Sequence, residues 1–431
     1  MKTNFSLERL ADPEVAASQQ EIRRCVHCGF CTATCPTYVL LGDERDSPRG
    51  RIELIRAMLE SDAPPTRATV THIDRCLSCL SCVSTCPSGV DYGRLIDHAR
   101  AHVEDTYRRP WPERLLRTAI PAVMTRPGRL SAALALGRLA KPLERLLPGP
   151  LKAMRRLTPA ATGRRAKAGV IPAAGESRGR VALLQGCVEP ALAPQIREAA
   201  IRLITRAGFD VVLAEGEGCC GALSEHLGRP EEARGLARAN VQAWSRSGEL
   251  SAIVTTAAGC GTMIKAYGEK LGEAGAAVAG RARDVLEFIA EVGLPPVVKP
   301  QGLAVAYHAA CSLQHGQQIK LQPPALLAEA GFDVRPVAES HLCCGSAGVY
   351  NILQPELAGR LRDRKADNVA RTDAAVLAAG NVGCMAQLAP AVGMPVVHPV
   401  ELLDWATGGP RPPALTPDAP LRPRAAVVAH G

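Results

Sequence analysis

The sequence predicts two folded parts in series: an α-helical domain built around two cysteine-rich loops, and a duplicated α/β domain with parallel sheets. Three observations support this prediction. One cysteine pattern occurs twice near the N-terminus, apolar strand-like runs alternate with helical patterns after residue 180, and four cysteines of that later region recur at one constant offset. Alternating strands and helices are typical of parallel sheets. A constant offset indicates an internal repeat.

The N-terminal pattern is C-x2-C-x2-C-x3-C-P, which begins at Cys25 and again at Cys76. This is the ligand run of bacterial two-cluster ferredoxins, in which three thiolates hold one iron–sulfur cube and the fourth reaches the other cube. A zinc ribbon or a disulfide framework would explain paired cysteines, but not a third cysteine and a Cys-Pro ending in both runs. By the ferredoxin rule we expect one [4Fe–4S] cluster on Cys25, Cys28, Cys31 and Cys86, and a second on Cys76, Cys79, Cys82 and Cys35.

Length and composition limit the remaining classes. The chain of 431 residues is long enough for two or three domains. Its 16 cysteines follow a polar start with no apolar leader pattern, so we expect metal or redox chemistry in a reducing, cytoplasmic compartment. No apolar run reaches the roughly 18 residues of a membrane span, so contact with the cytoplasmic face of the inner membrane would be peripheral. Aromatic residues are only 3% of the chain, which argues against a nucleic-acid partner that stacks on bases.

Residues 1–106 are predicted to form the helical two-cluster domain. The segment between the two cysteine runs has apolar residues at helical spacing, with Ser47 or Asp46 as its cap and Pro48 in its first turn. This helix favours the α-helical type of two-cluster ferredoxin over the small β-rich type. Arg49 and Arg51 either lie near a cluster or form a solvated helix start. The apolar positions are Ile52, Ile55, Met58 and Leu59.

Residues 107–180 are basic and rich in proline. Between Arg108 and Arg180 there are seventeen Lys and Arg residues and three acidic residues, although the whole chain has a net charge of only +9. Two interpretations stay open: a linker with a few packed helices, or a docking surface for an acidic partner or an anionic membrane face. The part from Pro159 to Gly179 is expected to be a mobile linker.

Residues 181–298 and 299–408 are predicted to be two similar α/β lobes, followed by a disordered tail at 409–431. In each lobe, short apolar runs indicate buried parallel strands. The expected strands are 181–184, 209–213, 252–256, 303–308, 331–334 and 375–379, and helices are expected at 194–207 and 231–246.

Each lobe carries four cysteines in the loops that follow its strands, including a Cys-Cys-Gly turn. Those of the second lobe lie 124 residues after those of the first. Ligands of open α/β sheets bind at this edge. We weigh an iron–sulfur site, a redox-active dithiol and buried structural cysteines, with His308 and His315 as candidate proton donors. The eight cysteines are Cys187, Cys219, Cys220, Cys260, Cys311, Cys343, Cys344 and Cys384.

From about Ile22 to Trp405 the chain resembles the iron–sulfur subunits of the heterodisulfide reductase type, and among them it looks most like the glycolate oxidase iron–sulfur subunits. The resemblance rests on the two C-x2-C-x2-C-x3-C-P runs followed by two Cys-Cys-Gly lobes. Further similar segments are 25–38, 48–52, 312–315 and 340–348. The resemblance implies a subunit of glycolate dehydrogenase that is inactive alone. Partner subunits carrying FAD would oxidise glycolate to glyoxylate, and this chain would relay electrons towards a quinone or another acceptor.

One departure from the heterodisulfide reductases concerns the end of each lobe. There the family pattern is C-x2-C, whereas here Cys260 is followed by Met263 and Cys384 by Gln387. Four cysteines per lobe argue against the five-cysteine non-cubane cluster of those enzymes and still allow a four-thiolate site.

Two functions of different class follow from these patterns. The first is an electron-transfer subunit with no substrate site, which the absence of a G-x-G-x-x-G nucleotide fingerprint favours. The second is a Cys-Cys-Gly domain with its own catalytic site for disulfide or quinone reduction, which the missing fifth cysteine makes less favourable. The same architecture would also suit a D-lactate or glycerol-3-phosphate dehydrogenase subunit.

Overall fold

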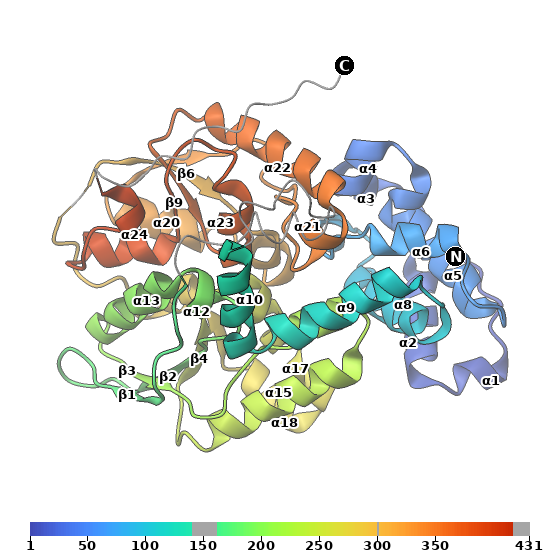
Figure 1. Ribbon diagram of the computed structural model, residues 1–431, viewed down its shortest axis with the longest axis horizontal. Helices are drawn as coiled ribbons and strands as arrows, with labels where there is room; N and C mark the ends of the chain where they lie inside the picture. The colour runs from blue at the N-terminus through green and yellow to red at the C-terminus, as the bar shows by residue number, and fades with distance from the viewer. Residues whose placement is uncertain (140–161, 300, 417–431) are drawn as a thin grey trace.

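The computed structural model describes residues 1–139, 162–299 and 301–416. In Figure 1 the N-terminal helices, in blue, lie at one end of the molecule, and the two α/β lobes, in green to yellow and in orange to red, lie together at the other. The predicted fold class, an all-helical cysteine-rich domain followed by a duplicated α/β domain, is confirmed.

The N-terminal domain consists of helices packed around a small apolar core. The core includes Ile22, Ile55, Ile96 and Val103, all of which are fully buried. Residues 1–106 are described throughout and contain no strand. The elements are α1 (Leu7–Leu10), α2 (Pro13–Arg24), α3 (Phe30–Thr34), α4 (Pro36–Leu41), η1 (Glu44–Asp46), α5 (Pro48–Glu60), α6 (Arg67–Asp74), α7 (Ser81–Thr85) and α8 (Tyr92–Thr106).

Helix α5 begins where the sequence predicts it. The Ser47 hydroxyl accepts a hydrogen bond from the Gly50 N–H at 3.0 Å, which satisfies one of the free donors of the first turn. Pro48 occupies that turn, where its missing N–H costs nothing. The four apolar side chains at helical spacing are buried in the domain core, as expected.

Two helices of the basic segment join the N-terminal domain to the lobes. Helix α9 (Trp111–Met124) buries Ile120 against Leu227 of the first lobe and Val349 of the second, so it packs against both. Helix α10 (Pro127–Leu139) follows it, and both are visible in Figure 1. Residues 140–161 of the predicted docking segment lie outside the described residues.

The first lobe has a five-stranded sheet in the order β1-β3-β2-β4-β5, in which only β1 is antiparallel to its neighbour. Strand β1 lies in the segment expected to be a mobile linker, and this expectation was wrong there because Gly169–Ile171 pairs with the edge of β3. The strands are β1 (Gly169–Ile171), β2 (Arg180–Leu183), β3 (Asp210–Leu213), β4 (Ala252–Thr255) and β5 (Ala282–Asp284). The helices are α12 (Glu189–Leu192), α13 (Pro194–Arg206), α14 (Ala222–His226), α15 (Pro230–Ser245), α16 (Ala258–Lys265), α17 (Tyr267–Leu271), α18 (Glu273–Ala279) and α19 (Val285–Val292).

The second lobe repeats this plan with a four-stranded parallel sheet in the order β7-β6-β8-β9. The strands are β6 (Ala304–His308), β7 (Asp333–Pro336), β8 (Val376–Ala379) and β9 (Val396–Val397). The helical elements are η3 (Ser312–Gly316), α20 (Gln322–Glu329), α21 (Tyr350–Leu353), α22 (Pro355–Ala370), α23 (Val382–Leu388), α24 (Pro399–Ala406) and η4 (Pro413–Leu415). The tail predicted to be disordered is described as far as residue 416, where η4 is its only helical turn, and residues 417–431 lie outside the described residues.

The two lobes share one apolar core across their seam. Helices α13 and α24 pack together there, and Asp404 of the second lobe forms ion pairs with Arg202 and Arg206 of the first. The parallel strands of both lobes therefore present their carboxyl ends, which carry the cysteines, to a common space. Across residues 1–139, 162–299 and 301–416, no helix has the length and hydrophobicity that crossing a membrane requires.

Candidate functional site

The two N-terminal cysteine loops share one tight backbone conformation. His27 and Gly29 of the first loop have φ values of 55° and 86°, and the corresponding Ser78 and Leu80 of the second have 49° and 60°. Left-handed backbone is unfavourable for residues other than glycine. Its recurrence at corresponding positions shows that both loops follow the same tightly curved path.

The first loop and the last cysteine of the second loop enclose one small cavity. Cys25, Cys28, Cys31 and Cys86 line it, together with Cys82. Cys28 is solvent-exposed, and the neighbouring apolar side chains of Val26 and Phe30 are 67% and 63% exposed. This cavity therefore lies at the surface of the protein.

A second group of thiols lies deeper. Cys82 interacts electrostatically with Cys79, Cys76 and Cys35, the three cysteines expected to share its cluster, and less strongly with Cys31 of the other set. Burial raises the pKa of Cys79 and of Cys82 well above the ordinary range. Metal binding requires the deprotonated thiolate. These thiols are therefore expected to lose their protons only when a bound metal centre stabilises the buried negative charge. A set of buried free thiols with no disulfide fits an iron–sulfur cluster.

Polar donors surround this deeper group. Arg51 is 1% exposed, and its guanidinium lies 3.9 Å from the Cys35 sulfur and donates to the Thr37 hydroxyl at 3.0 Å. The Tyr92 hydroxyl donates to the Cys76 sulfur at 3.8 Å. Of the two positions that the sequence left open for Arg51, the structure shows the one beside the cysteines.

A buried carboxylate holds Arg51 in place. Asp46 is fully buried and accepts hydrogen bonds from Arg51 at 3.2 Å and from Arg75 at 2.9 Å, and it contacts the His72 ring at 3.0 Å. The sequence analysis missed this network, because its members come from three separate segments. The one signal in the sequence was the position of Asp46 directly before the residue that caps α5, which indicates an ordered side chain.

The deeper thiols adjoin the second lobe. Cys79 interacts with Cys311, and Leu77 packs in one apolar cluster with Cys311 and Cys343. The Ser84 hydroxyl and the His315 ring are 2.7 Å apart across the same boundary. The N-terminal domain and the second lobe thus bring their cysteines together.

Each Cys-Cys-Gly turn needs its glycine. Gly221 and Gly345 have φ values of 96° and 87°. A Cβ atom would lie 2.9 Å from the Ala233 carbonyl oxygen in the first case and 2.5 Å from the Ala358 carbonyl oxygen in the second. Left-handed backbone and close approach to a helix both exclude a side chain, which agrees with the freedom expected of these glycines.

In the first lobe, neutral groups fix the Cys-Cys-Gly turn. Asn240 donates to the Cys219 carbonyl at 2.9 Å, and the Tyr267 hydroxyl donates to the Cys220 carbonyl at 2.8 Å. The sulfurs of Cys187 and Cys219 are 3.4 Å apart. Hydrogen bonds from Cys187 and Cys220 lower the pKa of Cys219 to about 4.

In the second lobe, a buried cation lies beside the thiols. The thiols of Cys311, Cys343, Cys344 and Cys384 form a chain of sulfur contacts. Lys365 is 2% exposed, interacts with the first three of these cysteines and donates to the Glu339 carbonyl at 2.5 Å. The two lobes therefore share a cysteine set and differ in charge.

The two histidines expected to be proton donors have different surroundings. His308 is 1% exposed, and burial lowers the pKa of its ring to about 3. His315 contacts the Ser84 hydroxyl and the His341 carbonyl. A buried neutral ring and a ring engaged at a domain boundary are both poorly placed to exchange protons with solvent.

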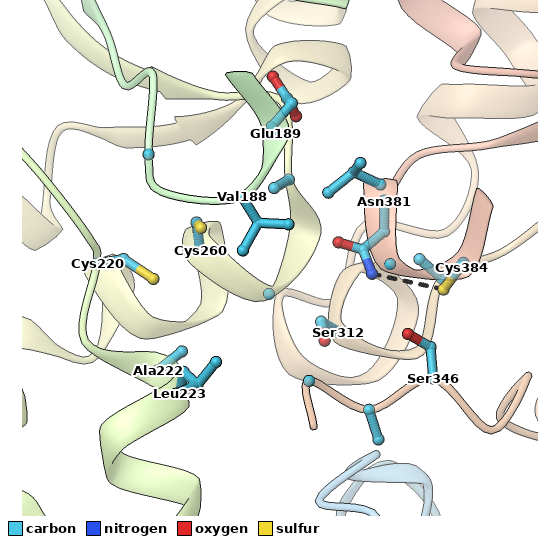
Figure 2. Close-up of a pocket in the computed structure, with 18 of the residues that line it drawn as sticks. Val188, Glu189, Cys220, Ala222, Leu223, Cys260, Ser312, Ser346, Asn381 and Cys384 are labelled. Carbon is cyan, nitrogen blue, oxygen red and sulfur yellow. Dashed lines mark hydrogen bonds between the residues drawn. The ribbon is translucent and has the colours of Figure 1, made fainter. Parts of the chain in front are cut away.

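The two lobes enclose a cavity of about 190 Å³. Figure 2 shows Cys220 and Cys260 on one side of it and Cys384, Ser346 and Asn381 on the other. The Asn381 side chain donates to the Cys384 sulfur at 3.5 Å. Cys79 of the N-terminal domain also lines this cavity, so all three parts of the protein meet there.

Two known domain families match the chain. The family described as 4Fe-4S dicluster domain matches residues 24–90, and the family described as Cysteine-rich domain (CCG) matches residues 181–265 and 305–389. These matches confirm the expected iron–sulfur chemistry and the internal duplication.

Several characterised proteins are similar along much of their length. The glycolate oxidase iron-sulfur subunit of Escherichia coli (strain K12) is 39% identical over 94% of this chain and 99% of that protein. The probable glycolate oxidase iron-sulfur subunit of Bacillus subtilis (strain 168) is 30% identical over 85% of this chain and 88% of that protein. The lactate utilization protein A of Exiguobacterium sp. (strain ATCC BAA-1283 / AT1b) is 25% identical over 52% of this chain. With its dicluster loops, its two Cys-Cys-Gly lobes and an end-to-end match at this identity, the chain belongs to the family of glycolate oxidase iron–sulfur subunits.

Proposed function

We propose that this chain is the electron-transfer subunit of a flavin-dependent glycolate dehydrogenase. Partner subunits that carry FAD oxidise glycolate to glyoxylate, and this chain passes the electrons towards a quinone. One observation carries the proposal: the cysteines form an unbroken series from an exposed site at Cys28, through the deeper thiols, to the cavity shared by both lobes.

Eight cysteines would hold the two [4Fe–4S] clusters in the crossed arrangement of bacterial ferredoxins. Each bound cluster supplies one-electron redox chemistry at nearly fixed geometry. Two observations support this division: Cys25, Cys28, Cys31 and Cys86 line one cavity, which Cys82 adjoins, and Cys79 and Cys82 interact electrostatically with Cys76 and Cys35.

The chain's own residues prepare these sites. Arg51 and Tyr92 aim hydrogen-bond donors at the sulfurs of Cys35 and Cys76, and donors of this kind stabilise an electron-rich cluster. The surrounding apolar core excludes water. The positive charge of Arg51 lies close to the Cys35 sulfur in a buried environment, where water screens it little. Its ion pair with Asp46 cancels part of that charge.

The exposed end of the series suits a docking partner. Cys28 and Val26 line the first cavity and are exposed, and Phe30, two residues further along the chain, is exposed as well. Exposed apolar groups next to a redox site are typical of protein contact surfaces. We place the flavin-bearing subunit here, and we place a peripheral contact with the cytoplasmic face of the membrane at α9, where Trp111 and Leu115 are 71% and 60% exposed.

Replacing a ligand at the entry point tests this function. In the complex assembled with Cys28→Ala, glycolate should still reduce the flavin, while reduction of the downstream acceptor should stop. Thr34→Ala, in the same loop, is the control and should keep full acceptor reduction. Acceptor reduction at the normal rate in Cys28→Ala would contradict the relay, and so would glycolate oxidation by this chain without its partners.

The cavity between the lobes supports a second candidate, in which this chain itself reduces a disulfide or a quinone. Its walls carry both cysteine sets and it has room for part of a small molecule. Mixing the chemically reduced chain with a disulfide or with a short-chain quinone distinguishes these cases. Reoxidation by the disulfide at a catalytic rate would favour a disulfide reductase, whereas reoxidation by the quinone alone would agree with a chain that delivers its electrons to a quinone.

A further inference from the structure

His308 is the most poorly satisfied polar side chain beside the cysteines. It ends β6, is 1% exposed, and neither of its ring nitrogens has a hydrogen-bond partner among the residues that the structure describes. A buried polar group without a partner is unfavourable, because it has lost its hydrogen bonds to water and gained none in return. A ligand that engages the ring would remove this unfavourable term.

Another histidine of the same lobe shows what a structural role looks like. His398 is equally buried, and its two ring nitrogens contact the Thr256 carbonyl at 2.9 Å and the Val400 N–H at 3.1 Å. Both nitrogens of His398 are therefore used to cap α24 and to join the lobes. Within the described residues, the ring of His308 neither caps a helix nor joins the lobes by a hydrogen bond.

The His308 ring faces sulfur ligands. A ring nitrogen of His308 and the sulfurs of Cys344 and Cys384 all lie within 4.8 Å of one another. Two thiolates and an imidazole at this spacing can bind one metal atom, because imidazole and thiolate are both good ligands for iron and zinc. The first lobe offers no such group, since the residue 124 positions earlier is Leu184.

We propose that an iron centre in the second lobe takes a ring nitrogen of His308 as a ligand beside the thiolates of Cys344 and Cys384. The second lobe then has a fifth donor residue that the first lobe lacks. This inference rests on the proposed function, in that the second lobe must hold iron. Because imidazole is neutral, an iron centre that binds it carries less negative charge than one bound by thiolates alone at the same number of ligands, and such a centre is easier to reduce.

The test uses the full chain, purified without oxygen and labelled with ¹⁵N-histidine. Pulsed electron paramagnetic resonance of the reduced protein should show the strong nitrogen coupling of a directly bound imidazole. The ligands proposed for the two N-terminal clusters are all cysteines, so such a signal must come from a lobe. This measurement needs no substitution and therefore does not depend on a variant that folds.

His308→Leu then assigns the signal, because it copies the first lobe at a position where leucine already fits the same fold. The nitrogen coupling should be lost, while about eight irons of the two N-terminal clusters should remain. His102→Gln, in α8, is the control and should keep the coupling. Absence of the coupling in the wild-type chain, its persistence in His308→Leu, or zinc in place of iron in the second lobe would each overturn the proposal.

The same samples separate this proposal from the proposed function. If the wild-type chain holds only about eight irons and still passes electrons to an acceptor, the His308 assignment fails and the electron-transfer role stands. If the chain holds no iron, both fail.

Discussion

The two lobes have the same fold and the same four cysteines, yet they surround those cysteines with different groups. In the first lobe the neutral side chains of Asn240 and Tyr267 fix the turn. In the second lobe, Lys365 and His308 are buried beside the thiols. The counterparts in the first lobe are Asn240, because α22 begins 125 residues after α15, and Leu184, which lies 124 residues before His308.

This difference shows that a duplication can keep the same cysteines in both copies while a few substitutions around them change the chemistry of one copy. The second lobe also touches the deeper thiols of the N-terminal domain through Cys79 and Cys311. A cation favours the reduced, more negative form of a nearby centre. We therefore expect electrons to reach the second lobe before the first.

The largest expected effect comes from removing one cysteine from each lobe in turn. In Cys343→Ser, electrons from the N-terminal clusters should reach neither lobe. The second lobe then has no intact centre, and we expect the first lobe to receive its electrons through the second. In Cys219→Ser, the second lobe should still be reduced. Freeze-quenched spectra after glycolate is added to the complex would separate the centres. Normal reduction of the first lobe in Cys343→Ser would contradict the order.

Lys365→Met should change the second lobe alone. Loss of a buried positive charge should cost the reduced state about 2 kcal/mol, on the order of 90 mV for a one-electron couple. Redox titration should show a lower potential for the second-lobe centre and no shift elsewhere. Lys265→Met, which removes a partly exposed lysine paired with Glu287, serves as the control. An equal shift in both variants would exclude a local effect of Lys365.

Tyr267→Phe should affect the first lobe. It leaves the buried Cys220 carbonyl without its hydroxyl donor, which should lower the free energy of unfolding by about 1–2 kcal/mol. The midpoint of urea-induced unfolding measures this loss. Tyr307→Phe is the control, since this buried tyrosine belongs to β6 of the second lobe. If Tyr267→Phe unfolds at the wild-type urea concentration, Tyr267 does not support the first-lobe turn.

The seam between the lobes should respond to pH. Burial raises the pKa of Glu189 to about 8. The nearby carboxylates of Glu401 and Asp284 also raise it, whereas Arg197 lowers it. The folded state therefore binds a proton that the unfolded state has released above its ordinary pKa of 4.5. Stability must then fall as the pH rises towards the folded-state pKa, by about 1 kcal/mol between pH 7 and 8. In Glu189→Gln, which mimics the protonated form, the urea midpoint should vary less with pH. An unchanged pH dependence in this variant would exclude Glu189 as the cause.

The fold could be predicted because its signals are local. Six apolar runs predicted six of the strands, and the constant cysteine offset predicted the duplication. Strands β5 and β9 were missed because two or three residues are too few to show a period, and β1 because its run Gly169–Ile171 lies in a polar, glycine-rich stretch. These short strands depend on pairing with neighbours rather than on their own sequence.

The sites could be predicted only in part, for the same reason. Cysteine spacing identified the thiols, because a curled loop needs a fixed number of residues. Lys365 lies in the charged helix α22, where its sequence resembles a solvated face, and it is buried because that helix covers the Cys-Cys-Gly turn. His308 lies at the end of β6, and whether its ring finds a hydrogen-bond partner depends on the segments that pack around it. The sequence near His308 alone does not determine this packing.

The central claim is that the series of cysteines is a series of iron–sulfur centres that continues into the lobes. Iron and acid-labile sulfide per chain, measured on protein purified without oxygen, test it most directly. We predict about twelve to sixteen irons, since each cubane cluster holds four. About eight irons would confine the relay to the N-terminal domain, and a value near zero with bound zinc would contradict the account.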